Sequence, residues 1–422
     1  MMGYVYPNEV EIQWSLLIVL YPFITGLVAG AFVVSSLYHV FNVRALKPVA
    51  SFSLVMALSF LLVAPLPLQA HLGRPERAFE IFLTPNFSSA MAGFGFIWLS
   101  YLILVVAETW LVFRPDIVHH ALTSTGPKRL VYRVLTLGAY EISEEARRID
   151  ERVIKVLAAI GVPAAALLHG YVGFLFGAIK ANPWWSTPLM PVIFLLSAIV
   201  SGIALLIVMY IVVMKLLDRP VDHACVSSLA KWLLAFLVLD VTIEGLEILS
   251  MAYESEESWE IVSQLIIQRI PISYLGIQLF LGSLIPLVIL GALASTLSQA
   301  RRETATAFAF LAAVLVLVGV FAMRWNVVIG GQLISKSTRG FLSYSPPLGG
   351  REGVLAAAAF MMLPFYLFYI ITSLIPPWQR VAFEEDEGTP QEEGERQEAL
   401  PAMGWASSSA ELQSGVWSRG GR

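Results

Sequence analysis

Nine long apolar runs divide this chain, and they constrain its fold more strongly than any other feature. They span residues 14–41, 49–71, 89–113, 153–179, 189–217, 226–253, 271–298, 304–330 and 352–376. At about 1.5 Å per residue, each run folded as a helix crosses the roughly 30 Å hydrocarbon core of a bilayer. Because lipid cannot bond backbone N–H and C=O groups, a spanning segment must be a helix or part of a closed barrel. Runs of this length predict helices, since barrel strands need only about ten residues.

The composition supports a membrane protein. Hydrophobic residues make up 57% of the chain and charged residues 14%, whereas soluble domains contain about 25% charged residues. The net charge of −4 includes eight acidic residues between Glu384 and Glu398, and no basic cluster suited to nucleic acid is present. We therefore predict an all-α integral membrane protein with about nine transmembrane helices, the lipid bilayer as its surroundings and no nucleic-acid partner.

Two features limit covalent and targeting chemistry. The single cysteine, Cys225, excludes a disulfide and a cysteine-ligated iron–sulfur cluster within this chain. The first residues include Glu9 and Glu11, and no small-residue cleavage site follows them. A secretory signal peptide would show the opposite pattern, so the first run is expected to remain as a helix.

The distribution of Lys and Arg predicts the orientation. Cytoplasmic loops are enriched in these residues, and with the N-terminus outside the inner loops hold most of them. The inner set is Arg44, Lys47, Lys128, Arg129, Arg133, Arg147, Arg148, Arg152, Lys155, Lys215, Arg219, Arg301 and Arg302. The outer set is Arg74, Arg77, Lys180, Arg269, Lys336, Arg339 and Arg351. The sequence therefore predicts an N-terminus outside and a C-terminus inside.

The order of the runs suggests two four-helix bundles plus an extra C-terminal helix. Residues 1–180, including the inner loop 114–152, would form the first bundle, and residues 181–330 the second. Residues 331–380 would add an outer loop and the ninth helix. The acidic, Gly/Ser-rich tail 381–422 is expected to be disordered.

Three smaller features refine this division. A faint internal repeat pairs Pro22, Gly26 and Gly30 of the first run with Pro191, Ser197, Ser201 and Gly202 of the fifth. The sequence around 141–152 predicts a polar helix on the inner surface. Residues 254–270 predict an outer amphipathic helix that begins with an acidic cluster.

The sixth run carries three acids, Asp240, Glu244 and Glu247. A charge in mid-membrane costs about 2.5–3.5 kcal/mol on insertion scales. Spacings of four and three residues place the three side chains on one helical face, where they repel unless they are protonated, paired or hydrated. Arg324 in the eighth run is the expected partner. The cluster is either a proton path or a buried ion pair that holds two helices together.

The fourth run contains a second polar candidate, His169, followed by Gly170 and Tyr171. A neutral imidazole can hydrogen-bond a quinone oxygen and exchange a proton near physiological pH. Gly173 and Gly177 open the helix surface to a flat ring or to another helix. The alternative is a histidine satisfied by a backbone carbonyl, with glycines that serve packing alone.

Further polar residues lie near the ends of the runs. Glu108 and His39 are candidate mouths of a proton pathway, or else solvated residues at headgroup level. His71 ends the second run, and Arg74 and Arg77 follow it at the surface, where they could contact lipid or a partner or could simply snorkel. Trp184 and Trp185 fit an aromatic belt at the membrane interface. Gly330 and Gly331 are expected to break the eighth helix, so that Gln332 faces a cavity.

Three ordered motifs resemble the NrfD-like family of polysulfide reductase membrane subunits. They are His-Leu-Gly-Arg-Pro-Glu-Arg-Ala-Phe with Thr-Pro-Asn (71–86), Gly-Tyr-Val-Gly-Phe-Leu-Phe-Gly with Asn-Pro-Trp-Trp-Ser-Thr-Pro-Leu-Met-Pro (170–191), and Arg-Trp-Asn-Val-Val-Ile-Gly-Gly-Gln (324–332). The last motif, with residues 333–340, looks most like the longer DsrP-like branch of sulfite-reduction-linked Dsr transmembrane complexes.

This resemblance implies a subunit that exchanges electrons between menaquinone or ubiquinone and a ferredoxin-like iron–sulfur subunit on the outer face. It implies no haem or iron–sulfur cluster in this chain, and further redox subunits such as a cytochrome or a molybdenum- or sulfur-linked catalytic subunit. The setting would be a bacterial or archaeal cytoplasmic membrane, and the complex would serve anaerobic respiration or sulfur metabolism.

By position, the resemblance matches Tyr171 to a family tyrosine beside the quinone and His169 to a histidine of some branches, and it implies that Arg74 lies near the docking surface. Together with the polar residues considered above, this gives three expected sets. The expected quinone-binding set is His169, Tyr171, His71 and Tyr21. The expected docking set is Arg74, Arg77, Trp184 and Trp185. The expected proton pathway comprises Asp240, Glu244, Glu247, Arg324, Glu108 and His39. Leu175 stands where a relative has an acid six residues after the histidine, which argues against proton coupling through the fourth run.

Two alternatives from other classes stay open. An ion-coupled secondary transporter would use Asp240, Glu244 and Arg324 as coupling groups, with helix breaks at Pro22 and Pro191. A haem-bearing cytochrome b-type anchor would need two histidines at matched depth, and His71 and His169 are the candidates in the outer half.

Overall fold

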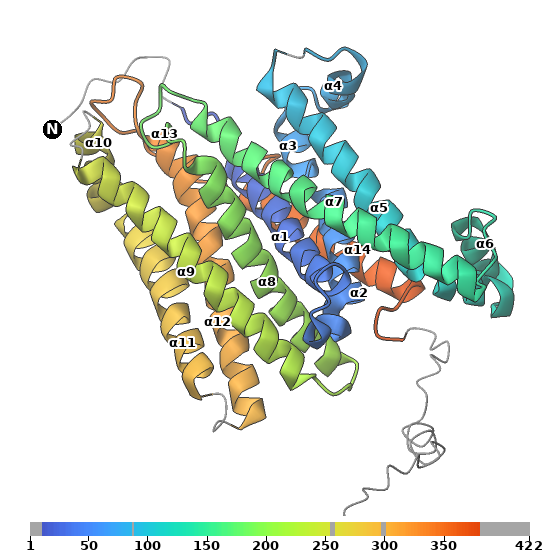
Figure 1. Cartoon of the computed structure of the whole chain (residues 1–422). Coiled ribbons are helices and arrows are strands. Elements are labelled where there is room, and N and C mark those ends of the chain that lie inside the picture. Colours follow the sequence, from blue (N-terminus) through green and yellow to red (C-terminus); the bar gives the residue numbers. More distant parts are fainter. Residues whose placement is uncertain (1–10, 87, 254–257, 297–300, 380–422) are drawn as a thin grey trace, which may run out of the picture. The chain divides into compact units, whose positions relative to one another are not determined.

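The nine predicted spans are all helical in the computed structural model, which describes residues 11–86, 88–253, 258–296 and 301–379 (Figure 1). Within these residues there is one isolated β-bridge, between Ile334 and Phe341, and no strand. The chain is therefore an all-α, multi-pass membrane protein. The spans are α1 (Leu16–His39), α2 (Lys47–Val63) with α3 (Leu66–His71), α5 (Ala90–Thr123), α7 (Glu144–Gly177), α8 (Met190–Leu216), α9 (His223–Tyr253), η5 (Ile272–Leu284) with α11 (Ile285–Thr296), α12 (Arg302–Trp325) and α14 (Val354–Leu374).

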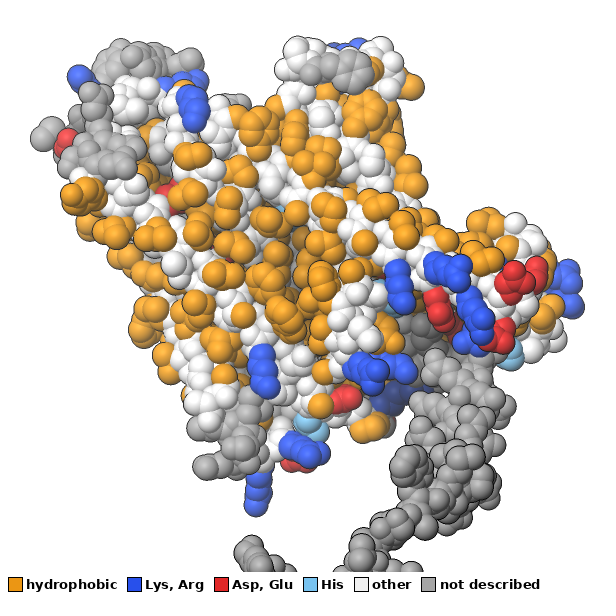
Figure 2. Space-filling view, viewed as in Figure 1, with side chains coloured by type: hydrophobic (Ala, Val, Ile, Leu, Met, Phe, Trp, Pro, Cys, Tyr) orange, Lys and Arg blue, Asp and Glu red, His pale blue; other side chains and the backbone are white. Residues whose placement is uncertain are grey.

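The spans alternate in direction, which gives the bundle two ends. The N-side carries residues 11–15 and the connections 72–89, 178–189 and 334–353. The C-side carries the connections 40–46, 124–143 and 217–222, and residues 375–379. On the face seen in Figure 2, hydrophobic side chains cover the middle of the molecule while Lys and Arg gather toward the ends. This pattern matches a protein that exposes apolar side chains to lipid; which end faces outward stays a prediction.

Helices α1 and α8 form the centre of the described fold. α1 is buried along nearly its whole length and packs against α2, α7 and α8. A Cβ added at Gly30 would clash with backbone atoms of Ile199 and Gly202 on α8. Small residues let membrane helices approach this closely. The two segments of the faint sequence repeat therefore pack against each other, and the division into two bundles stays a prediction.

Helices α5 and α7 extend well beyond their predicted spans. Each contains 34 residues, a length of about 51 Å. The third run ends at residue 113 in the sequence interpretation, but Arg114 lies inside α5 and pairs with Asp150 of α7 at 2.7 Å. Because this ion pair satisfies both charges, neither helix has to end there. The predicted polar helix at 141–152 is thus the first part of α7 from residue 144 onward.

Short elements close the two ends. On the C-side, α6 (Gly126–Leu135) joins α5 to α7, and its Tyr132 hydroxyl donates to Leu374 O at 2.8 Å. On the N-side, α10 (Trp259–Gln264) and the π-helical turn η4 (Leu265–Arg269) supply the predicted short helix. The acidic cluster expected before α10 and the tail 381–422 lie outside the described residues.

Two spans contain π-helical stretches, which often mark functional sites. They are η5 (Ile272–Leu284) and η6 (Asn326–Gly330), which follows α12. The predicted break at Gly330 and Gly331 is wrong, because the helix continues through both into α13 (Gly331–Leu333). The glycines instead permit close packing: a Cβ at Gly331 would overlap the Trp185 indole. α1 also runs unbroken through Pro22, and Pro191 lies in the first turn of α8.

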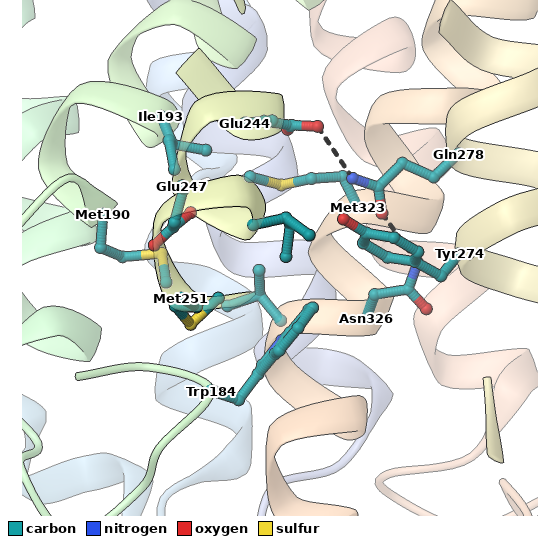
Figure 3. A pocket seen from close by; sticks show the side chains of 12 residues that line it. Trp184, Met190, Ile193, Glu244, Glu247, Met251, Tyr274, Gln278, Met323 and Asn326 are labelled. Atoms are coloured by element: carbon teal, nitrogen blue, oxygen red, sulfur yellow. Dashed lines mark hydrogen bonds between the residues drawn. The ribbon is translucent and has the colours of Figure 1, made fainter. Parts of the chain in front are cut away.

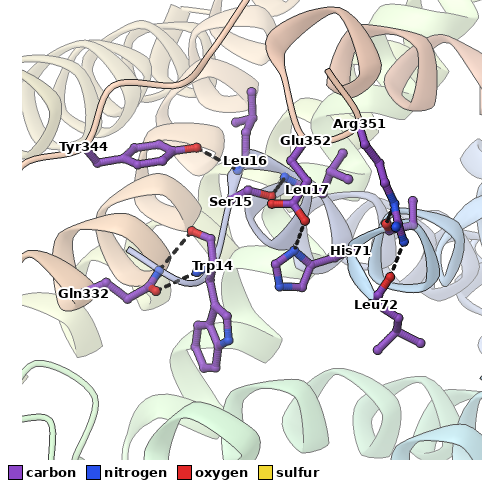
Figure 4. Close-up of polar contacts among 11 residues, drawn as sticks. Trp14, Ser15, Leu16, Leu17, His71, Leu72, Gln332, Tyr344, Arg351 and Glu352 are labelled. Atoms are coloured by element: carbon purple, nitrogen blue, oxygen red, sulfur yellow. Dashed lines mark hydrogen bonds and ion pairs between the residues drawn. The ribbon is translucent and has the colours of Figure 1, made fainter. Parts of the chain in front are cut away.

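Polar contacts join the N-side connections to one another (Figure 4). His71 Nδ1 lies 3.1 Å from a carboxylate oxygen of Glu352, next to the start of α14. Arg351 donates from Nε to Ala70 O at 2.6 Å and also bonds Leu72 O. These contacts anchor η3 (Pro75–Phe79) and α4 (Glu80–Leu83), which follow α3 on the N-side.

The central contact gives a first prediction. Replacing Gly30 with Ala places a methyl group against the backbone of α8, and overpacking of this kind costs about 1–3 kcal/mol. We expect Gly30→Ala to lower the thermal unfolding temperature of the purified protein in detergent. The matched control is Gly245→Ala, because no atom lies within 4 Å of a Cβ at that position. Equal unfolding temperatures for the two variants would contradict this account of the α1–α8 contact.

Candidate functional site at the N-side of the bundle

His169 connects α7 to α1. Its side chain is buried, its Nδ1 lies 3.0 Å from Ala165 O one turn earlier, and its Nε2 contacts Thr25 O of α1. Both ring nitrogens therefore face backbone carbonyls. This arrangement matches the alternative prediction for His169, in which a backbone carbonyl satisfies the imidazole ring. It also leaves neither nitrogen available as an axial ligand of a haem.

Tyr171 connects α7 to the start of α5. Its hydroxyl donates to Ala90 O at 2.6 Å, and its ring lies over Gly93. The two nearby glycines serve packing, because a Cβ at Gly173 or Gly177 would clash with backbone oxygens between residues 187 and 190. Tyr171 and the glycines thus hold α7 against two neighbours.

Tyr21 differs from the other members of the expected quinone-binding set. It lies one helical turn before Thr25 on α1 and is 4% exposed. Its ring packs edge-to-face on Phe94 of α5, with centroids 5.2 Å apart. Its hydroxyl has no hydrogen-bond partner in the described residues. Buried hydroxyls without a partner are uncommon and call for an explanation, such as a ligand or water.

A second polar site lies between α8, α9, η5 and η6 (Figure 3). Glu244 and Glu247 of α9 line a cavity of about 40 Å³, with Trp184 and Tyr274 on its wall. Since one ordered water needs about 10–15 Å³ on this measure, the cavity has room for a few waters and not for a quinone ring. Glu244 and Glu247 thus lie on one helical face, as their spacing predicts, and both line this small cavity.

A chain of side-chain hydrogen bonds leads from this cavity into the two π-helical stretches. Gln278 Nε2 donates to Glu244 at 3.1 Å, and Asn326 Nδ2 donates to Gln278 Oε1 at 2.8 Å. Ser273 completes the chain by donating to Asn326 Oδ1 at 2.6 Å. The sequence interpretation missed these three residues. Gln278 could have been noticed, because it is an amide side chain in an otherwise apolar run.

Arg324 does not form the expected ion pair. The ion pairs of the described residues do not include it. Its Nη2 donates to Ser197 Oγ at 2.8 Å and to Phe194 O at 3.3 Å, and its Cζ lies 4.0 Å from the centroid of the Phe194 ring. Arg324 therefore connects α12 to α8. Asp240 is buried, and its Oδ1 has no partner in the described part of the chain.

Glu108 stands apart from this second site. It is fully buried on α5, and neither carboxylate oxygen has a hydrogen-bond partner in the part of the chain that the structure describes. Tyr101, two turns away on α5, is also buried with an unpartnered hydroxyl. His39 lies at the C-side end of α1 and lines a different cavity. A proton route from His39 to Glu108 would therefore need water.

The residues of the expected docking set occupy two environments. Arg74 and Arg77 are exposed on the N-side, where Arg77 pairs with Glu80 at 3.4 Å. Trp184 and Trp185 are buried instead of forming a surface belt. Trp185 donates from Nε1 to Val327 O at 2.6 Å and stacks on Trp14, with centroids 5.1 Å apart. The tryptophans therefore support the N-side surface from beneath.

Gln332 belongs to the same support. Its side chain exchanges hydrogen bonds with both backbone groups of Trp14, accepting from N at 2.8 Å and donating to O at 3.2 Å (Figure 4). It also lines a groove of about 250 Å³ between residues 11–14, 179–185 and 332–342. Tyr344 accepts a bond from Leu16 N nearby, and burial raises the pKa of its phenol above the ordinary value. The third motif thus ends in contacts that hold the first residues of the described chain.

Among the described residues, no group of three or more His, Cys, Asp or Glu side chains is arranged to hold a metal ion. Of the acids of α9, Glu244 accepts a bond from Gln278, and Asp240 Oδ1 has no partner among the described residues. The described histidines lie on α1, α3, α5, α7 and α9, with His119 and His120 adjacent on α5.

Comparison with known proteins places the chain in a family. The family model described as "Polysulphide reductase, NrfD" matches residues 6–336. This chain belongs to the polysulphide reductase NrfD family. The match includes all three motifs and ends before α14. The predicted family is thereby confirmed, whereas the match does not distinguish the DsrP-like branch.

Three relatives illustrate the breadth of the NrfD family. The chain is 27% identical over 383 residues to a selenate reductase subunit of Mesobacillus selenatarsenatis, covering 87% of each protein. It is 30% identical over 323 residues to a putative dimethyl sulfoxide reductase membrane subunit of Halobacterium salinarum, covering 76% of this chain and 69% of that protein. It is 22% identical over 240 residues to an Hdr-like menaquinol oxidoreductase integral membrane subunit of Archaeoglobus fulgidus, covering 56% and 52%.

The hydrogen-bond chain from Glu244 to Ser273 generates the second prediction. In Asn326→Leu, Gln278 and Ser273 each lose a partner, and a buried polar group left unpaired costs about 1–3 kcal/mol. We expect this variant to unfold at a clearly lower temperature in detergent. Ser273→Ala is the control, since it removes only the terminal donor of the chain and should cost less. A smaller loss for Asn326→Leu than for Ser273→Ala would contradict the chain.

Proposed function

We propose that this chain is the quinone-interacting membrane subunit of a respiratory reductase complex. The NrfD family match and relatives that are named as subunits of selenate and dimethyl sulfoxide reductases support this proposal. A relative named as a menaquinol oxidoreductase subunit supports a quinone as the exchanged molecule. The observation in this chain that carries the proposal is the buried, unpartnered hydroxyl of Tyr21. The quinone would be menaquinone or ubiquinone.

Tyr21 is the proposed hydrogen-bond donor to a quinone oxygen. Its phenol can donate to a carbonyl acceptor, and its ring is fixed by Phe94. His169 and Tyr171 would define the site as positioning residues, because the His169 ring lies between carbonyls of α1 and α7, to one of which it can donate, and the Tyr171 hydroxyl donates to a carbonyl of α5. His71 would border the site, held by Glu352. A bound quinone supplies the two-electron redox chemistry, and the protein supplies orientation and hydrogen bonds.

The N-side is the proposed docking face for a ferredoxin-like iron–sulfur subunit, and we place it on the outer side of a cytoplasmic membrane. Arg74 and Arg77 are exposed there, and Phe79 is 63% exposed beside them. Exposed Arg with neighbouring aromatic residues is typical of protein interfaces. Trp184 and Trp185 would act indirectly, by supporting this face. Further redox subunits, a cytochrome or a molybdenum- or sulfur-linked catalytic subunit, would complete the complex.

The cavity lined by Glu244 and Glu247 is the proposed proton route of the complex. Its volume has room for a few waters, which could relay protons between its acids, and Gln278 donates to Glu244 beside it. Asp240, one turn before Glu244, would extend the route toward the middle of the membrane. Arg324 would set the local electrostatic field, and Glu108 with His39 would form a separate entry from the C-side.

The transporter and the haem-bearing anchor have weaker support. Discontinuous helices at Pro22 and Pro191 would favour a transporter, but α1 is continuous and α8 begins at residue 190. A haem would need His169 as a ligand, and both of its ring nitrogens face carbonyl oxygens. We further propose a place in the DsrP-like branch, on the likeness of residues 324–340.

A third prediction tests the quinone site. Tyr21→Phe removes the hydroxyl and keeps the ring, so the loss should equal one neutral hydrogen bond of about 1 kcal/mol. We expect kcat/KM for quinol in the purified complex to fall about 3- to 10-fold, while the complex keeps all of its subunits.

The control is Tyr366→Phe, because that side chain is 61% exposed on α14. It should leave quinol turnover unchanged. Wild-type kcat/KM in Tyr21→Phe would refute the role of Tyr21, and purification without any iron–sulfur subunit would refute the wider proposal.

A fourth prediction tests the proton route. Glu244→Gln keeps the shape of the side chain and removes its exchangeable carboxyl. In liposomes that contain an ionophore, we expect the variant complex to continue quinol turnover. In liposomes without the ionophore, we expect the membrane potential generated per electron to fall to less than half. Glu260→Gln, an exposed position on α10, is the matched control. An unchanged potential in Glu244→Gln would exclude this route.

A further inference from the structure

The largest of the described cavities lies on the C-side, away from both sites above. It has a volume of about 410 Å³ and sits where the end of α1, the start of α2, the end of α8 and the segment after α14 meet. Its lining residues are Tyr38, His39, Lys47, Pro48, Ala50, Ser51, Phe52, Tyr210, Met214, Arg219, Pro220, Pro377 and Trp378. This volume lies within the range of small-molecule sites, about 300–1,000 Å³.

The charges around this C-side cavity have one sign. Lys47 and Arg219 line it, and no Asp or Glu of the described residues does. The described ion pairs include neither cation. Asp218 precedes Arg219 in the sequence and does not line the cavity. The next acid, Asp222, accepts bonds from Ala224 N at 2.9 Å and Cys225 N at 3.0 Å. These bonds commit its carboxylate to the first turn of α9.

One hydrogen bond holds the Arg219 side chain in place and leaves most of its N–H donors available. Its Nη1 donates to Trp378 O at 2.8 Å, which is its one side-chain hydrogen bond within the described chain. A guanidinium has five N–H donors in all. Arg is well suited to binding phosphate, because its planar donors match two phosphate oxygens at once. The cavity therefore offers a fixed guanidinium and an ammonium to an anion.

Part of the cavity wall is apolar and well packed. Phe52 is 2% exposed and packs against Phe368 and Tyr210, with centroids 5.0 and 6.1 Å apart. Met214 and Pro48 add further apolar surface. A ligand with both an anionic head and an apolar body would satisfy the two kinds of lining. Phospholipids of the adjoining bilayer have this chemistry, and basic pockets at helix ends are typical sites for anionic headgroups.

We propose that this cavity binds the phosphate of an anionic phospholipid, with Lys47 and Arg219 as its ligands. The glycerol and the first part of the acyl chains would contact Phe52, Met214 and the prolines. The bound lipid would thereby join α1, α2 and α8 to the segment that follows α14. This site is separate from the proposed quinone site and from the cavity lined by Glu244 and Glu247, and it shares His39 with the proposed C-side proton entry.

The test measures lipid binding by the full-length protein. We expect phosphatidylglycerol to raise the unfolding temperature in detergent and to remain bound in native mass spectrometry, whereas phosphatidylcholine does neither. In Lys47→Gln with Arg219→Gln, the apparent affinity for phosphatidylglycerol should fall at least tenfold. Lys47→Gln alone should give a smaller loss, and it keeps the Arg219 bond to Trp378, so that a folding defect can be recognised.

The matched control is Lys215→Gln, which removes an exposed cation from the same end of α8 without touching the cavity. It should bind phosphatidylglycerol like the wild type. Equal binding by the double variant would overturn the site. Equal stabilisation by inorganic phosphate would show that the anion comes from solution and not from lipid. Displacement of the lipid by a soluble quinone analogue would assign the cavity to the quinone instead. Either result would overturn the proposal.

Discussion

The close approach of α1 and α8 is the contact on which the described fold depends. Lipid solvates apolar side chains as well as a protein core does, so membrane helices associate through tight packing and internal polar bonds. Gly30 and Gly202 allow the two backbones to touch. The positions of α7, α2 and α12 follow, because each packs directly on one of these two helices. The bonds of His169 to α1 and of Arg324 to α8 then add polar contacts to this centre.

Around this centre, polar side chains form two different kinds of site. On α1, α5 and α7 nearly every polar atom of the expected set bonds a backbone carbonyl, and the hydroxyl of Tyr21 is left without a partner in the described residues. On α9, Glu244 accepts a hydrogen bond from the amide of Gln278 beside a cavity with room for a few waters. The first arrangement suits the orientation of a ring, and the second suits the passage of protons. Both lie toward the same end of the bundle.

Sequence patterns predicted the spans well because lipid imposes one rule on every residue of a span. The same rule does not say which helix a side chain faces. Asp240, Glu244 and Glu247 could be placed on one face from their spacing, but Arg324 could have reached several neighbours, and it bonds Ser197 instead of an acid. The end of α5 was placed too early and the start of α7 too late, because the pairing of Arg114 with Asp150 is invisible in the sequence. The π-helical stretches could not have been foreseen at all, since an extra residue in a helical turn leaves the hydropathy of a run unchanged. Gln278 and Asn326 meet across two such stretches, so their partnership is a tertiary property.

The aromatic contacts of α14 have a bearing on how the protein is made. Phe365 and Phe368 cover Phe60 and Phe52 of α2, although α14 is synthesised long after α2. During translation that face of α2 must rest against lipid or an insertion factor until α14 arrives. A chain shortened before residue 354 would enter the bilayer with this face of α2 uncovered.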